Sequence, residues 1–301
     1  MTPEFIAPSS AGLAGVAAIR AMLAANPDDA DTDLATRRAR LAAFAAAAPT
    51  LPQPIVEARI GGVRVLRTAP PAARGRFIYL HGGAYVLGSA DTHARLAGVY
   101  ARASEAEAIA VDYRLAPEHP HPAAVDDAVA VWNALAGDGV PTALIGDSAG
   151  GGLVLATALR LRDAGGVQPV ALAMTSPWVD LTMTAASLTE RDNVEVMLSR
   201  RGLALDADRY RGALPAADPR VSPLFADLAG LPPVLVQVGS AEILFDDAIS
   251  LARRLDAAGV AVQLQVWEGM AHAWAAFGDA VPEAALSVAA LGDFVRERLA
   301  A

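Results

Sequence analysis

The sequence predicts an α/β fold in which a mostly parallel central sheet of about eight strands is flanked by helices. The first observation is that short, continuously apolar runs alternate with segments of helical periodicity along most of the 301 residues. Strands that are apolar on both faces are typical of parallel sheets covered by helices on each side. The second observation is composition, because 54% hydrophobic and 19% charged residues exclude a disordered chain.

Eight short runs are the expected strands. The first two flank Gly61-Gly62, a dipeptide typical of a two-residue hairpin turn. The other six alternate with helical segments, as parallel strands joined by crossover helices do. The expected strands are residues 55–60, 63–66, 77–80, 108–111, 143–145, 171–174, 234–238 and 262–266.

The expected helices and one long insertion define the domain organisation. An Ala-rich segment, residues 10–48, predicts two helices separated by a turn at 27–29, where aspartates suit a helix start. Residues 180–227 separate two strands by far more than a crossover helix, and such insertions tend to lie over the carboxyl ends of the strands. Further helices are expected at 92–103, 123–135, 149–162, 246–258 and 282–299, and the predicted units are an N-terminal helical cap segment (1–50), a cap insertion (180–227) and a core (51–179 and 228–301).

Charge and residue usage exclude several function classes. The chain has 24 Lys and Arg against 33 Asp and Glu, a net charge of −9, so nucleic acid is not expected as a partner. The absence of cysteine excludes a disulfide scaffold, a thiolate zinc site and a cysteine nucleophile. No secretory signal is evident and no apolar run approaches the ~18 residues of a membrane span. We therefore expect a cytoplasmic protein.

The strongest chemical signal is Gly146-Asp147-Ser148-Ala149-Gly150, which follows an expected strand and precedes an expected helix. A nucleophile elbow needs a sharp strand-to-helix turn with small neighbours on either side of the serine. The helix would also direct its amide donors at negative charge that develops on a substrate oxygen. The sequence therefore predicts Ser148 as a nucleophile.

A second glycine pair, in His81-Gly82-Gly83, follows the expected strand at 77–80. Glycines allow the backbone to approach a ligand closely with its N–H groups pointing inward. We expect Gly82 and Gly83, with Ala149, to form an oxyanion hole. Neither glycine segment has the pattern of a nucleotide-binding loop.

The serine needs a base, and a nucleophile elbow is followed in chain order by an acid and then a histidine. His272 is the single histidine after Ser148, in a loop just beyond the last expected strand. The residues leave the acid open, because the loop after the strand at 234–238 offers Glu242, Asp246 and Asp247. The aspartate pair at a helix start is also typical of capping residues.

Several separate motifs resemble one enzyme family. The motifs HGGAY, DYRLAPE at 112–118, GDSAGGG and the closing histidine loop are similar to those of the bacterial hormone-sensitive-lipase family (family IV) of α/β-hydrolase esterases. The resemblance covers about residues 77–274. In that family the acid stands in a G-x-x-D-x-L-x-D pattern, which aligns Glu242 with the acid, a departure from the commoner Asp, and leaves Asp246 as the alternative.

The resemblance implies a serine carboxylesterase that acts on short to medium acyl esters without a metal or cofactor. A lactone hydrolase is the nearer alternative. A small-ligand receptor is the distant one, since the related plant gibberellin receptors have lost the histidine that His272 supplies here. Apolar residues expected to bind the acyl or alkyl group are Tyr85, Val86, Leu87, Trp178, Met183 and Trp274. A homodimer that pairs the final strand, residues 262–266, edge to edge is a further expectation.

Overall fold

A computed structural model describes residues 1–25, 32–48 and 51–301. Within these residues the strands form one nine-stranded sheet with the order β1-β9-β8-β7-β6-β4-β5-β3-β2. The predicted eight strands are all present, and the ninth is β1. The strands are β1 (Glu4–Ile6), β2 (Val56–Ile60), β3 (Val63–Thr68), β4 (Arg76–Leu80), β5 (Glu107–Val111), β6 (Thr142–Asp147), β7 (Leu172–Thr175), β8 (Val234–Gly239) and β9 (Val262–Trp267).

The sheet is parallel except at one end. β3 pairs antiparallel with β2 and with β5, and Ile60 faces Val63 across the predicted Gly61-Gly62 hairpin. All other neighbouring strands run parallel. Because parallel strands end at the same edge, the segments that follow β4, β6, β7, β8 and β9 meet on one side of the molecule.

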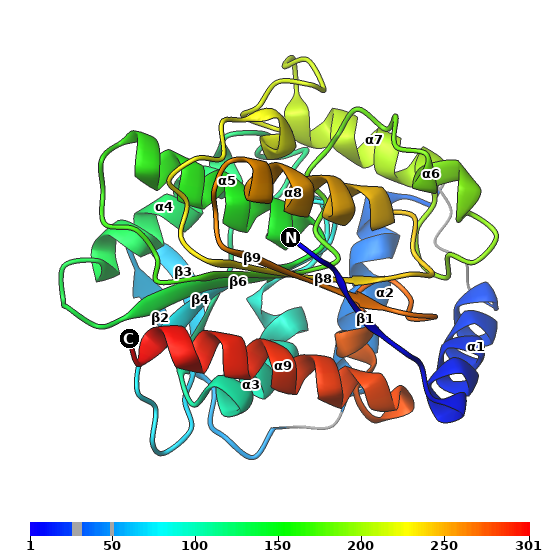
Figure 1. The fold of residues 1–301 in the computed structure, drawn as a ribbon, viewed down its shortest axis with the longest axis horizontal. Helices are drawn as coiled ribbons and strands as arrows, with labels where there is room; N and C mark the ends of the chain where they lie inside the picture. The colour runs from blue at the N-terminus through cyan, green and yellow to red at the C-terminus, as the bar shows by residue number, and fades with distance from the viewer. Residues whose placement is uncertain (26–31, 49–50) are drawn as a thin grey trace.

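Helices cover both faces of the sheet (Figure 1). One face carries α3 (Ala90–Ser104) and α9 (Pro282–Leu299), which lie below the sheet in this view. The other face carries α4 (Ala123–Leu135), α5 (Ala149–Asp163) and α8 (Phe245–Ala257). The ends of these helices lie within two residues of the predicted ones, so the expected α/β architecture is confirmed.

The continuous apolar strands are buried on both sides, as their sequences predict. In β4, Ile78 and Leu80 pack in the core beneath α4, α5 and α8, whereas Phe77 and Tyr79 pack in the core beneath α3 and α9. All four side chains are fully buried. Burying a side chain of this size contributes about 1.5–3 kcal/mol, so the two cores hold the sheet rigidly beneath the loops at its carboxyl edge.

The N-terminal strand β1 changes the expected edge of the sheet. Glu4–Ile6 pairs parallel with β9, with Phe5 opposite Val266. The expectation that the strand at 262–266 forms an exposed edge is therefore wrong, because β1 covers its backbone N–H and C=O groups. A homodimer remains a prediction, without that strand as its contact.

The N-terminal helices are α1 (Ser10–Ala24) and α2 (Leu34–Ala46). Ser9 and Asp33 cap them by accepting hydrogen bonds from the backbone N–H groups at the third position of each helix. Two helices were predicted in this part of the chain. The predicted turn at 27–29 lies outside the described residues.

The insertion, residues 180–227, contains the short helix α6 (Ser187–Glu190), the helix α7 (Arg200–Arg211) and the 3₁₀ turn η1 (Pro223–Phe225). α6 and α7 lie beyond the layer formed by α5 and α8 (Figure 1). Arg37 of α2 makes two hydrogen bonds, of 2.9 and 3.0 Å, to the buried carboxylate of Asp206 on α7. The N-terminal segment and the insertion are thus joined directly.

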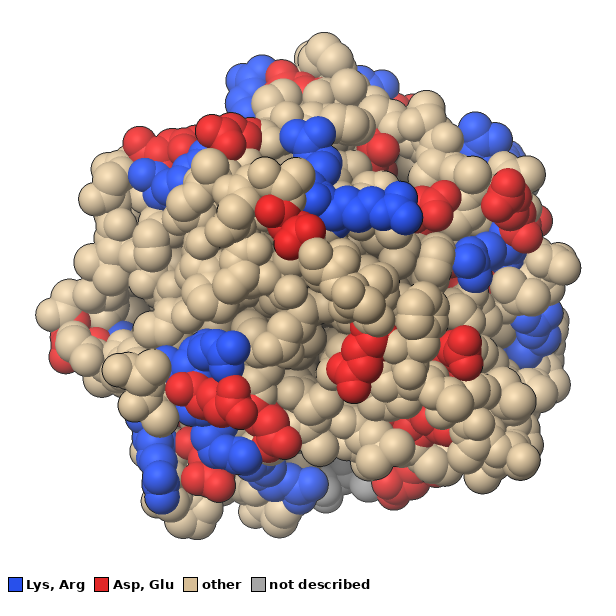
Figure 2. Space-filling model, viewed as in Figure 1, with Lys and Arg blue, Asp and Glu red and all other residues tan. Residues whose placement is uncertain are grey.

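Charged side chains of both signs are interspersed on the face shown in Figure 2. Ion pairs of this exposed kind include Arg296–Asp293 and Arg298–Glu297 on α9. Such pairs contribute about 0–1 kcal/mol each, so burial of apolar surface dominates the stability of the fold. Among the described residues, no helix has both the length and the apolar character needed to cross a membrane.

Candidate active site

Ser148 occupies a strained turn between β6 and α5. Its φ of 53° and ψ of −125° lie in a region that non-glycine residues rarely adopt. A Cβ atom at Gly146 would lie 2.5 Å from the carbonyl oxygen of Gly150, and one at Gly150 would lie 2.0 Å from that of Leu80. Glycine is therefore required on both sides of the serine, and the geometry is that of the predicted nucleophile elbow.

The backbone of Ser148 is fixed to the end of the neighbouring strand. Its N–H donates to the carbonyl of Thr175 in β7 (2.9 Å), and its own carbonyl accepts from the N–H of Trp178 (2.9 Å). Only 7% of Ser148 is exposed. The segment after β7 thus holds the elbow in place.

The predicted oxyanion donors differ in their hydrogen bonding. Within the described residues, the N–H groups of Gly83 and Ala149 have no hydrogen-bond acceptor, and Ala149 is the first residue of α5. The N–H of Gly82 instead donates to Asp147 Oδ1 (3.1 Å). The assignment of Gly82 to an oxyanion hole stays a prediction, and it requires Gly82 to share this donor between Asp147 and substrate.

Asp147 joins the elbow to the glycine loop that follows β4. The same oxygen that accepts from Gly82 also accepts from the hydroxyl of Tyr79, and Asp147 is buried. His81 stacks on Tyr113, with 4.1 Å between ring centroids, and the Tyr113 hydroxyl donates to the His81 carbonyl (2.7 Å). These contacts place Asp147 and His81 in the scaffold that joins the elbow to the glycine loop.

The predicted acid and base lie together in the interior. Glu242 Oε2 lies 2.7 Å from His272 Nδ1, and the two residues are 0% and 2% exposed. A carboxylate in this position holds the imidazole with its proton on Nδ1 and leaves Nε2 free to accept one. No hydrogen bond joins His272 to Ser148 in the described structure, so proton transfer between them stays a prediction.

Ser176 links the acid to the loop that carries the base, and sequence reasoning missed it. Its hydroxyl donates to Glu242 Oε1 (2.8 Å) and accepts from the N–H of Ala273 (3.0 Å), directly after His272. Glu242 Oε1 also accepts from the N–H of Gly239 (2.7 Å). Both carboxylate oxygens of Glu242 therefore have donors, which offsets the cost of burying the charge. The available signal was the position of Ser176, immediately after a strand at the active edge of the sheet.

The environment of His272 favours its charged form. Burial lowers its pKa, but the hydrogen bond and the negative charge of Glu242 outweigh this effect, and the charges of Glu195 and Asp147 add to them. The pKa of His272 is raised above its ordinary value. The residue is thus a stronger base than a solvent-exposed histidine.

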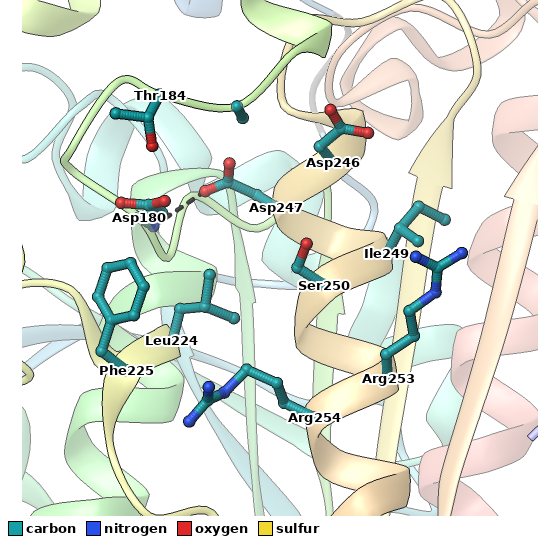
Figure 3. A pocket seen from close by; sticks show the side chains of 11 residues that line it. Asp180, Thr184, Leu224, Phe225, Asp246, Asp247, Ile249, Ser250, Arg253 and Arg254 are labelled. Carbon is teal, nitrogen blue, oxygen red and sulfur yellow. Dashed lines mark hydrogen bonds between the residues drawn. The ribbon is translucent and has the colours of Figure 1, made fainter.

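Asp246 and Asp247 line a cavity whose wall includes neither Glu242 nor His272. This cavity, of about 630 Å³, lies between α8, η1 and the start of the insertion, and Figure 3 shows both carboxylates on its wall. Asp246 Oδ2 accepts from the N–H of Ser187 (2.8 Å), and Asp247 Oδ2 accepts from Val179 and Asp180 (both 2.9 Å). The geometry favours Glu242 over Asp246 as the partner of His272.

The predicted substrate-contact residues separate into two groups. Tyr85, Val86, Trp178 and Met183 are buried in the core beneath α4, α5 and α8, with Leu87 packed against it. Trp274 instead packs beside Trp267 and α1, in a separate cluster. The structure therefore does not bring Trp274 together with the other predicted contact residues.

Tyr210 of α7 is a further residue that sequence reasoning missed. Its ring stacks on Tyr85, with 3.7 Å between centroids and 8° between planes, and Tyr85 lies two residues after Gly83 in the predicted oxyanion loop. Both tyrosines are 2% exposed. An aromatic residue in a helix of the insertion was the available signal, but helical spacing alone does not reveal its partner.

Comparisons with known proteins agree with this geometry. Residues 77–276, more than half of the chain, match the family model for the α/β hydrolase fold. An acetyl-hydrolase of Streptomyces hygroscopicus is 42% identical over 231 residues, 75% of this chain and 77% of the relative. The carboxylesterase NlhH of Mycobacterium tuberculosis is 35% identical over 272 residues, 82% of this chain and 84% of the relative.

The same result comes from solved structures. The crystal structure of an esterase from the bacterial hormone-sensitive lipase family matches with a TM-score of 0.91 and 37% identity, covering 97% of this chain and 99% of that one. The strand order, the strained serine and these similarities all agree with the family expected from the motifs. The chain belongs to the hormone-sensitive-lipase family of α/β-hydrolase-fold carboxylesterases.

Proposed function

We propose that the protein hydrolyses short to medium acyl esters with a triad of Ser148, His272 and Glu242. The observation that carries the proposal is the buried 2.7 Å contact between Glu242 and His272. These residues follow β8 and β9, at the same edge of the sheet as the strained serine that follows β6. Ser176 supports it, since this residue touches the acid and the histidine loop while its neighbour Thr175 accepts from Ser148.

The proposed cycle is acyl transfer. His272 Nε2 takes the proton of the Ser148 hydroxyl, and the serine oxygen attacks the ester carbonyl. The tetrahedral intermediate collapses, and His272 gives the proton to the leaving alcohol. Water, activated by His272 in the same way, then releases the acid from Ser148. Glu242 holds the imidazole in the productive tautomer and stabilises its charged form throughout.

The oxyanion would bind to the backbone N–H groups of Gly83 and Ala149, which are free of internal acceptors in the described structure. The positive end of α5 points at the same position and favours the developing charge. Gly82 would contribute by sharing its N–H with Asp147. Each such donor is worth about 2.7–4 kcal/mol in the transition state.

Tyr85 and Tyr210 support a preference for short acyl groups. Their stacked rings join the oxyanion loop to the insertion and leave little freedom on that side of the site. The N-terminal segment and the insertion would together act as a cap, joined to each other by Arg37 and Asp206. Arg38 ties the same N-terminal segment to the loop after β4 by donating to the carbonyl of Val86 (2.8 Å). A lactone hydrolase using the same triad is the second candidate, because ring opening needs the same nucleophile and oxyanion site.

Two measurements test the proposal. The variant Ser148→Ala is expected to lose at least ~10⁴-fold in kcat, and a phosphonate inhibitor should label Ser148 in the wild type and nothing in the variant. Near-full activity of the variant would contradict the triad. A chain-length series of p-nitrophenyl esters, measured beside a seven-membered lactone, tests the substrate. Maximal rates on the longest chains would overturn the short-acyl assignment, and a higher kcat/KM on the lactone would favour the second candidate.

A further inference from the structure

Glu195 is a buried carboxylate of the insertion that the proposed mechanism does not use. It lies in the segment between α6 and α7 and is 9% exposed. Its Oε1 accepts hydrogen bonds from the backbone N–H groups of Val196 (2.7 Å), Met197 (2.8 Å) and Leu198 (3.3 Å). One oxygen of this carboxylate is thus fully occupied in shaping its own loop.

The second oxygen of Glu195 reaches another part of the chain. Oε2 accepts from the N–H of Ile243 (3.0 Å), which is the residue directly after Glu242. Hydrogen bonds to a charged acceptor are about twice as strong as those between neutral groups. The contact therefore fixes the backbone at the position from which the side chain of the acid leaves.

Other contacts hold the same loop from the same side. The Ser187 hydroxyl donates to the carbonyl of Ile243 (2.7 Å), and Arg191 donates to the carbonyl of Ser240. On the opposite side, Ser176 and Gly239 donate to the carboxylate of Glu242. The loop that carries the acid is therefore clamped between the ends of the strands and the insertion.

The charge of Glu195 also acts on the base. No Arg or His side chain forms an ion pair with Glu195 in the described residues, and its carboxylate accepts from backbone N–H groups. The nearby cation is Arg20 of α1, which donates to the carbonyls of Asn193 and Val194. The charged groups that act on His272 are Glu242, Glu195 and Asp147, and each raises its pKa.

We propose that Glu195 is a positioning residue for ester hydrolysis, through which the insertion fixes the backbone at Ile243 and so aims Glu242 at His272. The inference rests on the proposed triad. The insertion would then position the acid of the triad, in addition to any role as a cover over the substrate. A change in the packing of the insertion would then alter the chemical step as well as substrate binding.

The variant Glu195→Gln tests this directly. An amide keeps one oxygen for Val196, Met197 and Leu198 but turns an NH₂ group toward the N–H of Ile243, so it breaks the contact with the acid loop and removes the charge. The matched control is Glu190→Gln, which removes the same charge from an exposed residue of the same insertion. Both variants are compared with the wild type by thermal unfolding, kcat, KM and the pH profile of kcat/KM.

The expected result for Glu195→Gln is a fall in kcat of about 10- to 100-fold with little change in KM, because the acid is misaligned and substrate contacts are not. The acid limb of kcat/KM should move to lower pH, since a negative charge near His272 is lost. Glu190→Gln should behave as the wild type. An unchanged kcat and an unchanged acid limb in a folded Glu195→Gln enzyme would overturn the inference.

A second variant covers the case in which glutamine prevents folding. Glu195→Asp keeps the charge but is one methylene shorter, so it should lower kcat while leaving the acid limb near that of the wild type. A normal kcat in this variant would contradict the positioning role. Phosphonate labelling distinguishes a failure of the triad from a failure of the role proposed for Glu195. An unlabelled wild type would refute both. A labelled Ser148 with unaltered kinetics in both Glu195 variants would refute the role of Glu195 alone.

Discussion

Glu242 Oε2 lies 2.7 Å from His272 Nδ1, and both residues are almost fully shielded from solvent. A hydrogen bond to a charged carboxylate is stronger where water cannot compete for it. The imidazole therefore has one preferred tautomer and one preferred ring orientation. Catalysis should depend on this single contact more than on the other carboxylates nearby.

Replacing each candidate acid separately tests that dependence. Glu242→Gln should lower kcat by about 10²- to 10⁴-fold, because the amide can turn its NH₂ toward Nδ1 and stabilise the wrong tautomer. The control Asp246→Asn should change kcat little, since Asp246 lines the cavity in Figure 3 and accepts from Ser187. Initial rates on a p-nitrophenyl ester measure kcat in both variants. Equal losses of kcat would contradict the assignment of Glu242, and not Asp246, as the acid.

The pH dependence should follow the base. The raised pKa of His272 means that the free enzyme loses its base by protonation already above pH 6.5, the ordinary pKa of histidine. We expect the midpoint of the acid limb of kcat/KM to lie above 6.5 and activity to fall as the pH decreases through it. A profile on a neutral ester between about pH 5 and pH 9 measures this. A midpoint below 6.5 would mean that burial outweighs the charge of Glu242.

Ser176 should matter for rate as well as for stability. Ser176→Ala removes a donor to Glu242 and an acceptor for the N–H of Ala273, so kcat should fall about 10- to 100-fold with a stability loss of about 1–3 kcal/mol. The control Ser222→Ala removes an equally buried hydroxyl that bonds to Leu181 and Ala216 within the insertion. It should lose similar stability and retain kcat. If both variants lose only stability, measured by denaturant unfolding, Ser176 has no part in aligning the triad.

The sheet could be predicted largely because its strands are continuously apolar, a pattern that depends on burial of both faces and not on distant partners. β1 was missed because Glu4–Ile6 has only three residues, two of them exposed, and owes its conformation to pairing with β9, more than 250 residues away. Its position follows from tertiary pairing, which no local pattern of three residues can indicate.

The candidate site likewise contains some residues that the local sequence predicts and others that depend on distant partners. Ser148 and the glycines beside it form a local motif whose geometry follows from a sharp turn, so the sequence alone predicts them. Glu242 needed the family resemblance, because three carboxylates in one loop are equivalent until their directions are known. Ser176 and Tyr210 act through partners 30 or more residues away, and nothing in their own segments indicates those partners.

Asp247 provides a prediction about stability that is independent of the triad. Burial raises its pKa to about 8, helped by the charges of Asp180 and Asp246 and opposed by the N–H groups of Val179 and Asp180. The unfolded chain loses this proton near pH 4 whereas the folded protein keeps it to about pH 8, so this group makes the wild type progressively less stable across that range as the pH rises. Asp247→Asn keeps an oxygen for both N–H groups and does not titrate.

The melting temperature of Asp247→Asn should therefore rise relative to that of the wild type between about pH 5 and pH 8, with the difference growing toward the alkaline end. Asp279→Asn is the control, since it makes the same substitution at an exposed carboxylate that is not among the charges acting on Asp247. Thermal unfolding of the three proteins in matched buffers checks it. A constant difference between Asp247→Asn and the wild type would mean that Asp247 is ionised in the folded protein, and that the two backbone donors outweigh the cost of its burial.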